Sequence, residues 1–473
     1  MKVRVETLLA KSVGWFGLAF ALFSLLTVVR LSLAAAFIAY AILFFRVLGP
    51  DRLSRLRHWL SNHELHVWLF ILLLALAFRG GFFWVGYSGD LTSFQCGDGK
   101  HFWNWSKDVA MGGLPEVKSW ATVAVYSCLL RLTSCGLGTA FVFNIVLQIA
   151  TACLFYVFGR RVFGRVSATL AFAAYLLSPT FVMMAFMTIS EHFFYLFISL
   201  CLLAVERCQA KKSFVWAAAA AVFAWLATWS RGEGALLILV AGFCILVELL
   251  NGGRCRHAVL LSFSVYFAVA CLCGCAGWSF NRRVYGNNTV FCANDSWWPR
   301  LHGANVESHG RMASKMPIYK MYIADHPKDR ERILEVKKKP NFCPKELVPY
   351  IRQETARRWR AMTLWTKVRL IVENWHYEWA HAYAGGGRLV VQGFRAVIYE
   401  SAPVVVLALS AFGLWRRQRV WMGIDWLELA PLLLIGGMCC VLALYESNIR
   451  YGTMLLVLLP FYVARKGTPN GNT

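Results

Sequence analysis

The residues whose side chains are best suited to catalysis lie in a long polar segment, residues 86–120. It contains Asp90 and Asp98, and Lys100 and His101 follow Asp98 closely. A carboxylate can accept the proton of an attacking hydroxyl, so either aspartate is a candidate general base. Each also has a simpler interpretation, because Ser-Gly-Asp and Cys-Gly-Asp-Gly are sequences typical of turns.

A second group of charged residues lies at the ends of other apolar runs. Its members are Arg79, Glu191, Arg231, Glu233, Arg282, Arg283, Glu446 and Arg450. Arginines bind phosphate through paired hydrogen bonds and stabilise the charge that grows on a leaving group. An acid and several arginines at one membrane face therefore indicate a transfer reaction with a phosphate leaving group. Taken singly, most of these residues are better explained as solvated charges at the ends of spans.

The elements that must position these residues are membrane-spanning helices. The chain has 473 residues, of which 58% are hydrophobic and only 16% charged, and its mean hydropathy is +0.51. In a soluble protein about a quarter of the residues would be charged. Many apolar runs reach the roughly 17–25 residues that cross a bilayer, and they do not alternate as barrel strands do. The sequence therefore predicts an all-α polytopic membrane protein.

The apolar runs and the basic connections between them give a topology. The runs are residues 13–29, 31–48, 65–88, 138–158, 166–185, 189–206, 214–230, 235–250, 258–278, 396–414, 427–444 and 449–464. Short connections rich in Lys and Arg fall on alternate sides, as the positive-inside rule expects. We therefore expect about twelve transmembrane helices with both termini inside. A signal-peptidase site at 31–36 is rejected because cleavage would leave an odd number of spans.

Four regions follow from this topology. Residues 1–64 form an N-terminal helical hairpin with a basic cytoplasmic loop, and residues 65–278 form a transmembrane catalytic module that includes a first outer loop at 86–137. Residues 279–395 form a large extracytoplasmic loop, and residues 396–473 form C-terminal helices with a cytoplasmic tail. The run 121–133 is too short for a span, and we expect it to form a helix on the interface or in the bundle. Apolar residues at helical spacing over 351–380 predict an interfacial amphipathic helix.

Two features bear on partners and cofactors. The net charge of +24 is accounted for by cations that flank spans, so we expect contacts with membrane lipids and none with nucleic acid. No Cys pair has the spacing of a metal site, and no adjacent acids would hold a divalent ion, so neither a metal nor a cofactor is predicted.

Arg79 lies about two turns below the predicted outer surface, in the run that ends in Gly-Gly-Phe-Phe-Trp. An arginine at that depth is costly unless it faces protein or water. The alternative is that the span ends at Arg79 and the side chain snorkels to the surface. The sequence leaves both interpretations open.

Five short segments, taken in order, resemble a known family. The first is Arg79, near the end of its span, followed by DGKHFWNWSKDVAMGG from Asp98, and the second is LLSPTFVMMAFMTISEHFF, which contains Glu191. The third is the span that ends at Arg231. The fourth is WSFNRRVYGNNTV followed by WWPRLHGANVESHG, and the fifth is ESNIRY from Glu446. The pattern resembles the polyprenyl-phosphate-dependent glycosyltransferases of the C superfamily. Protein O-mannosyltransferases and lipid A aminoarabinose transferases are the most similar members. The resemblance covers about residues 65–465, and the order of the segments is its most informative part.

The resemblance implies an integral membrane glycosyltransferase. It would move a monosaccharide from a polyprenyl-phosphate donor to an extracytoplasmic acceptor hydroxyl, on a glycan, lipid or protein, with inversion. The expected location is a bacterial inner membrane. The first-loop acid of the family implies Asp98 as the base, with Arg79, Arg231, Arg282 and Arg450 as candidates to bind phosphate. Relatives often have a second acid next to the first, whereas Gly99 follows here, so Asp90 stays open as the base.

Two other functions remain compatible with the sequence. A lipid or small-molecule transporter would also have many spans and basic loops, although no internal repeat is visible. A polysaccharide polymerase or ligase with a diphosphate-linked donor would need more arginines in its outer loops, and this chain has many. Transfer of label to an acceptor would separate an enzyme from a transporter.

Overall fold

The structure is a computed structural model. It describes residues 50–87, 89–95, 98–113, 119–133, 136–250, 256–285, 290, 318–338, 347–371, 426–442 and 458–462. Throughout these ranges the regular structure is helical, which confirms the predicted all-α class. The predicted runs 13–29, 31–48 and 396–414 lie outside the described residues.

Four helices are long and apolar enough to cross a membrane. They are Asn62–Gly86, Leu137–Val162, Glu191–Lys211 and His257–Val284. Shorter apolar helices lie beside them, at Trp120–Thr133, Arg165–Leu177, Phe214–Ser230 and Gly232–Val247. The predicted membrane class is thus supported by length and composition, while the count of about twelve spans stays a prediction.

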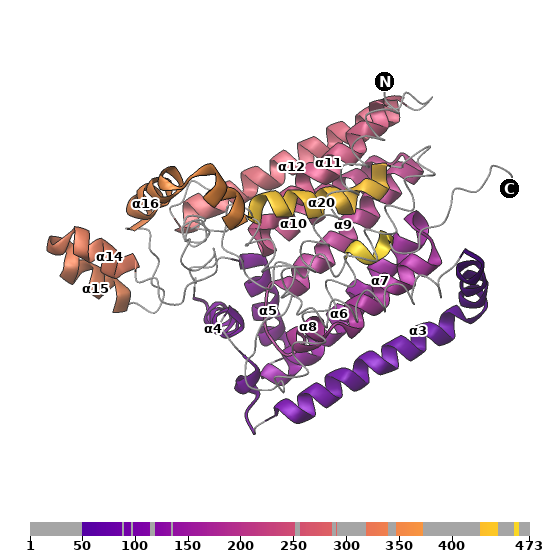
Figure 1. The fold of residues 1–473 in the computed structure, drawn as a ribbon, viewed down its shortest axis with the longest axis horizontal. Helices are drawn as coiled ribbons and strands as arrows, with labels where there is room; N and C mark the ends of the chain where they lie inside the picture. Colours follow the sequence, from indigo (N-terminus) through magenta and orange to yellow (C-terminus); the bar gives the residue numbers. More distant parts are fainter. Residues whose placement is uncertain are drawn as a thin grey trace.

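The helices that form the bundle lie side by side, with α9 and α10 near its middle (Figure 1). Their bounds are α3 Pro50–Gly86, α5 Trp120–Thr133, α6 Leu137–Val162, α7 Arg165–Leu177, α8 Pro179–Met184, α9 Glu191–Lys211, α10 Phe214–Ser230, α11 Ala235–Leu250, α12 Arg256–Tyr285 and α20 Trp426–Leu442. A 3-10 turn, η6 at Leu459–Tyr462, packs against α7. Apart from 166–185, the predicted runs between 138 and 278 therefore correspond closely to helices.

Helix α10 is central because its small residues allow close packing. Five of its alanines are fully buried: Ala217, Ala220, Ala221, Ala224 and Ala227. Helices α9 and α12 both pack against α10. In lipid, where helices gain little from the hydrophobic effect, such small residues let backbones approach and improve van der Waals contact.

The long helix α3 contacts the bundle at two separated polar points. Near its start, Glu64 accepts a hydrogen bond from Tyr156 and forms an ion pair with Arg160, with 3.0 Å between the charged atoms. Near its end, the Arg79 guanidinium donates to the Leu176 carbonyl at 2.9 Å. Between these points one face of α3 packs on the bundle, where Ile71 and Ala75 are buried, while the opposite face, which includes Phe70, is exposed. The helix also extends through residues 50–62, where the sequence predicted a basic cytoplasmic loop, and bends at His63.

The predicted single span at 166–185 is wrong, because the helix breaks at its middle. Helix α7 ends at Leu177, and Ser178 takes an extended ψ of 127° before Pro179 opens α8. Proline lacks a backbone N–H and pushes the preceding residue out of the helical region. Helix α8 ends at Met184, and residues 185–190 run without helical structure into α9.

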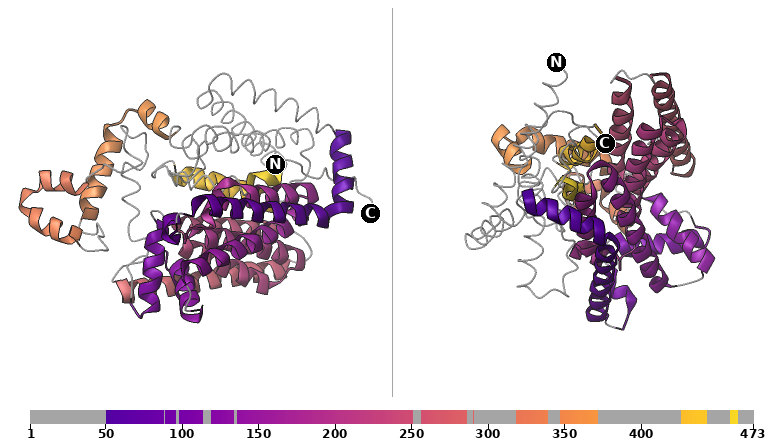
Figure 2. Two further views of the ribbon diagram at one scale, coloured as in Figure 1. Left: turned by 90° about the horizontal axis from the view of Figure 1, so that it is seen from below. Right: turned by 90° about the vertical axis from the view of Figure 1, so that its right-hand side faces the viewer.

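A group of short helices projects from one end of the bundle (Figure 1 and Figure 2). It contains α14 Ile318–Asp325, η3 Pro327–Asp329, α15 Arg330–Lys338 and α16 Val348–Ala361. The predicted amphipathic helix at 351–380 is only partly correct. Helix α16 ends at Ala361, Met362 is extended with a ψ of 138°, and a second helix runs over 364–371. Thr363 caps this second helix, because its hydroxyl accepts a hydrogen bond from the Thr366 N–H at 3.2 Å.

Candidate functional site

The irregular stretch between α8 and α9 is buried, and its carbonyls are bonded to side chains of α6. The Asn144 amide donates to the carbonyls of Ala185 and Met187, at 3.2 and 3.0 Å. One turn along α6, the Gln148 amide donates to the Phe181 carbonyl at 2.9 Å. Non-helical backbone at membrane depth is stable only where protein or water satisfies its polar groups. Asn144 therefore holds this stretch in place, and Gln148 holds the short helix α8 that precedes it.

Two further side chains complete the support. The Gln95 amide donates to the Phe186 carbonyl at 3.1 Å and accepts a hydrogen bond from the Thr188 hydroxyl at 2.9 Å. On the other side, a ring nitrogen of His192 lies 2.9 Å from the Met184 carbonyl. The first outer loop and the start of α9 are thus tied to the same stretch. Sequence reasoning missed these residues; their one signal was polar side chains within or beside apolar runs.

The predicted base lies next to this stretch. Helix α4, Asp98–Ala110, begins at Asp98, and the Gly99 carbonyl accepts a hydrogen bond of 2.6 Å from the Thr188 hydroxyl. A side chain at position 99 would begin only 2.8 Å from the Gln95 side-chain oxygen. A side chain at this position would therefore displace the Gln95 amide, which binds Thr188 and the Phe186 carbonyl. The side chain of Asp98 itself lies outside the described residues.

Three charged residues meet where α9 begins and α10 ends. The Arg231 guanidinium lies 2.6 Å from a Glu191 oxygen and 3.1 Å from a Glu233 oxygen. Glu191 is 2% exposed and Arg231 is 12% exposed, so water is largely excluded. The guanidinium also lies 5.8 Å from the centre of the Phe194 ring. This cluster, called the Arg231 cluster below, joins two predicted site residues that are forty positions apart.

The backbone around Arg231 explains its position. Arg231 follows the last residue of α10 and is extended, with φ −150° and ψ 135°. The short turn η2, Gly232–Gly234, then reverses the chain into α11. A side chain at Gly234 would collide with the backbone of Ala227 and Thr228, whereas the space at Gly232 is open. The sequence Arg-Gly-Glu-Gly therefore provides both the charges and the tight turn that carries them.

Asp90 is bound in a different way. It caps the 3-10 turn η1, Leu91–Phe94, and accepts hydrogen bonds from the Thr92 N–H, at 2.9 Å, and from the Thr92 hydroxyl. These hydrogen bonds, the hydroxyl first, lower the pKa of the Asp90 carboxyl below its ordinary value. A carboxylate with lower pKa is a weaker base. The geometry therefore favours the capping interpretation for Asp90.

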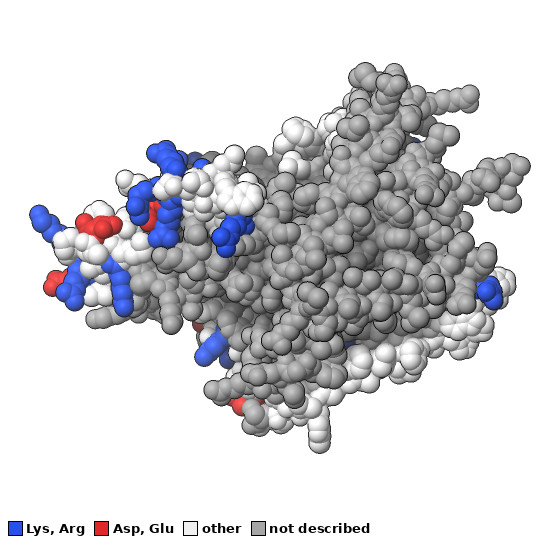
Figure 3. Space-filling model, in the orientation of Figure 1, with Lys and Arg blue, Asp and Glu red and all other residues white. Residues whose placement is uncertain are grey.

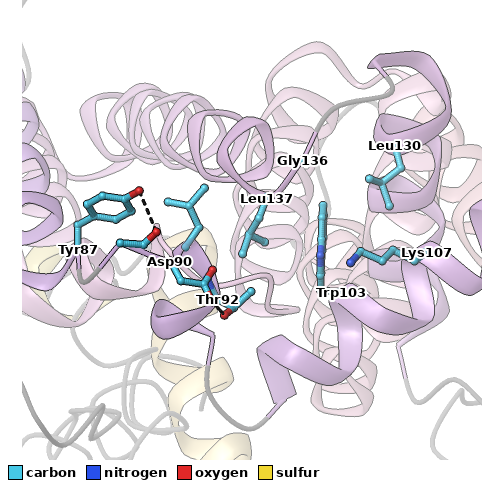
Figure 4. A pocket seen from close by; sticks show the side chains of 10 residues that line it. Tyr87, Asp90, Thr92, Trp103, Lys107, Leu130, Gly136 and Leu137 are labelled. Atoms are coloured by element: carbon cyan, nitrogen blue, oxygen red, sulfur yellow. Dashed lines mark hydrogen bonds between the residues drawn. The ribbon is translucent and has the colours of Figure 1, made fainter.

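A pocket of about 400 Å³ lies beside Asp90 (Figure 4). Its lining includes the rings of Tyr87 and Trp103, and the Lys107 ammonium lies 5.5 Å from the centre of the Trp103 ring. Positions 98 and 107 are nine residues apart, which is about two and a half helical turns. Residue 98 therefore lies on the opposite side of α4 from Lys107. Position 98 of the backbone and the pocket beside Asp90 thus lie on different sides of α4.

Arg79 faces protein, so the snorkelling interpretation is wrong. Its side chain is buried, and its donors reach the carbonyls of Ala75 and Leu176 and the Gln148 side-chain oxygen, the last at 2.6 Å. These acceptors account for most of its hydrogen-bonding capacity. Its predicted phosphate contact remains a prediction, and the observed contacts give Arg79 a structural role between α3, α6 and α7.

The other predicted residues lie on α4, on α12 or outside the described ranges. Lys100 and His101 are exposed on α4, and the His101 ring stacks on Trp105 with 5.8 Å between centres. Arg282 and Arg283 are exposed in the last turn of α12. Glu446 and Arg450 lie outside the described residues.

Within the described ranges, no three His, Cys, Asp or Glu side chains come together as metal ligands. The chain matches no model of a known protein family, and no curated protein matches it. The functional conclusion therefore depends on the residues and contacts described above.

Proposed function

We propose that this chain is an integral membrane glycosyltransferase. It transfers a monosaccharide from a polyprenyl-phosphate donor to an acceptor hydroxyl, with inversion at the anomeric carbon, at the extracytoplasmic face of a bacterial inner membrane. The observation that carries the proposal is the hydrogen bond from Thr188 to the Gly99 carbonyl. It links the start of α4, where Asp98 lies, to the buried stretch that leads three residues later into the Arg231 cluster.

The proposed chemistry uses these groups as follows. The acceptor oxygen attacks the anomeric carbon while the bond from that carbon to the phosphate oxygen breaks. Asp98 takes the proton of the acceptor hydroxyl. Arginine donors stabilise the phosphate as its charge grows. Arg231 is the best-supported candidate among the described arginines, because its partner Glu191 follows three residues after Thr188, which is bonded to the start of α4.

The experiment compares the two aspartates. Purified protein is reconstituted into liposomes with a polyprenyl-phosphate monosaccharide that carries a radiolabelled sugar, and acceptors are extracted from the host membrane. We expect Asp98→Asn to lower transfer by about a hundredfold or more. We expect Asp90→Asn to keep most of the activity, because asparagine also caps helical turns.

Thermal unfolding of both variants serves as the folding control. Full transfer by a well-folded Asp98→Asn variant would refute the assignment of the base. Loss of transfer in Asp90→Asn alone would move the base to the pocket side of α4.

A transporter is the second candidate, and the interrupted helix between 166 and 190 favours it. Broken helices at membrane depth often carry the substrate and ion sites of transporters. The same liposomes separate the two functions. Label that crosses the bilayer and stays on its lipid, with none on an acceptor, would support transport and overturn the proposed transfer.

A further inference from the structure

The second helix of the projecting region, residues 364–371, exposes apolar side chains. Leu364 is 78% exposed, Trp365 is 75% exposed and Val368 is 43% exposed. Its other side packs against the protein, since Leu370 is 1% exposed. An exposed group of large apolar residues on one side of a helix is a feature of surfaces that bind protein or membrane.

The break at Met362 separates this helix from α16, which packs differently. Helix α16 buries Ile351 completely and leaves Thr355 only 5% exposed. Without the break, a continuous helix would carry its apolar residues along one stripe. The extended residue at 362 starts a new helix whose apolar side chains Leu364, Trp365 and Val368 remain exposed.

Cations surround this apolar side. Residues 348–371 contain six cations and one acid: Arg352, Arg357, Arg358, Arg360, Lys367, Arg369 and Glu354. The single acid is already bound, because Glu354 accepts hydrogen bonds from Arg357 at 2.7 Å and from Arg358 at 2.8 Å. These bonds lower the pKa of Glu354 to about 2, so the carboxylate is ionised at neutral pH. Among the described residues, Arg360 and Lys367 form no ion pair.

Lys and Arg side chains gather on the projecting region in the space-filling view (Figure 3). The region extends from one end of the helix bundle (Figure 1 and Figure 2). The predicted topology places this end of the spans at the polar headgroups. Tryptophan is enriched at this depth of a bilayer, and basic residues there are attracted to anionic lipids.

We propose that helix 364–371 lies on the bilayer surface, with Leu364, Trp365 and Val368 among the acyl chains, and that Arg360 and Lys367 make it select anionic phospholipids. The lipids are those of the membrane in which the chain resides. The combination of exposed tryptophan, flanking cations and a site at the end of the spans fits a lipid surface better than a protein partner. The inference does not depend on the proposed transfer reaction.

The experiment uses the full-length protein in nanodiscs of equal parts phosphatidylcholine and phosphatidylglycerol. A photoreactive benzoylphenylalanine replaces Trp365, and mass spectrometry identifies the lipids attached after irradiation. We expect lipid adducts in which phosphatidylglycerol exceeds phosphatidylcholine by about fivefold, the ratio that one basic residue near an anionic surface provides. Arg360→Gln with Lys367→Gln should bring the ratio close to one while the total yield remains.

Two control positions make the result decisive. Benzoylphenylalanine in place of Leu272, which is 68% exposed on α12, should give lipid adducts. Benzoylphenylalanine in place of Leu334 on α15 should give none. Adducts at 272 with none at 365 would overturn the docking. Crosslinks from 365 to protein would overturn it in favour of a protein contact. An equal lipid ratio at 365 in the unaltered background would overturn the selection of anionic lipid.

Discussion

At the scale of single residues, the Arg231 cluster places the tightest constraint on how helices α9 and α10 pack. Glu191 and Arg231 are nearly excluded from water and lie 2.6 Å apart. Removing charges from water is expensive, so a buried pair is stable only when both partners are present. The pair also joins the start of α9 to the end of α10, so its geometry depends on both helices.

Breaking this pair should destabilise the fold strongly. We expect Arg231→Gln to lower the free energy of unfolding by about 3–5 kcal/mol, because it removes the cation that pairs with the buried Glu191 carboxylate. Glu191→Gln should lower it less, because Arg231 keeps its ion pair with Glu233. The double variant should lose clearly less than the sum of the two. Denaturant unfolding of the unaltered protein, the two single variants and the double variant in detergent micelles gives the coupling energy of the pair.

The pair of Arg161 and Glu206 gives the matched control. The charged atoms of this pair lie a similar 2.8 Å apart, but the side chains are more exposed, Arg161 by 32% and Glu206 by 13%. Its coupling energy should stay at or below about 1 kcal/mol. Equal coupling energies for the two pairs would show that burial does not set the strength of the Arg231 cluster.

At the scale of elements, the sequence predicted most of what hydropathy can encode. The runs 138–158, 189–206 and 258–278 correspond to helices whose length and composition suit a membrane span. The break near Ser178 was missed because an apolar run conceals it, although Pro179 was its signal. The support from Asn144 and Gln148 could not be predicted, because their partners are backbone carbonyls more than thirty positions away. Glu191 and Arg231 were named as site residues, yet their pairing required the packing of α9 against α10.

The turn η2 provides a prediction at this scale. Gly234→Ala should destabilise the protein and disturb the Arg231 cluster, because the new methyl group collides with backbone atoms of Ala227 and Thr228. Gly232→Ala should have little effect, since no other atom lies within 4 Å of the added carbon. Thermal unfolding of the two variants in micelles measures the difference. Equal stabilities would contradict the tight approach at Gly234.

At the scale of the whole molecule, the candidate site and the basic connections lie at opposite ends of the same helices. Helix α9 begins at Glu191 and ends at Lys211, which places its ends about 30 Å apart. That distance matches the apolar thickness of a bilayer. Positive-inside reasoning puts the Lys211 end in the cytoplasm and the Glu191 end outside.

Labelling from one side tests this orientation. A variant with its native cysteines replaced receives Lys100→Cys or Lys211→Cys, both at exposed positions. In intact cells or spheroplasts, we expect a membrane-impermeant maleimide to label position 100 and not position 211. Position 211 should react only after permeabilisation. The reverse pattern would invert the topology and place the candidate site in the cytoplasm.

The two polar attachment points of α3 also limit how the molecule responds to its solvent. Glu64 and Arg79 are fifteen residues apart, or about 22 Å along the helix axis, and each is bound to a different level of the bundle. The helix cannot slide like a piston without breaking one of these attachments. A change in acyl-chain length must therefore be absorbed by tilt of the assembly as a unit or by deformation of the surrounding lipid.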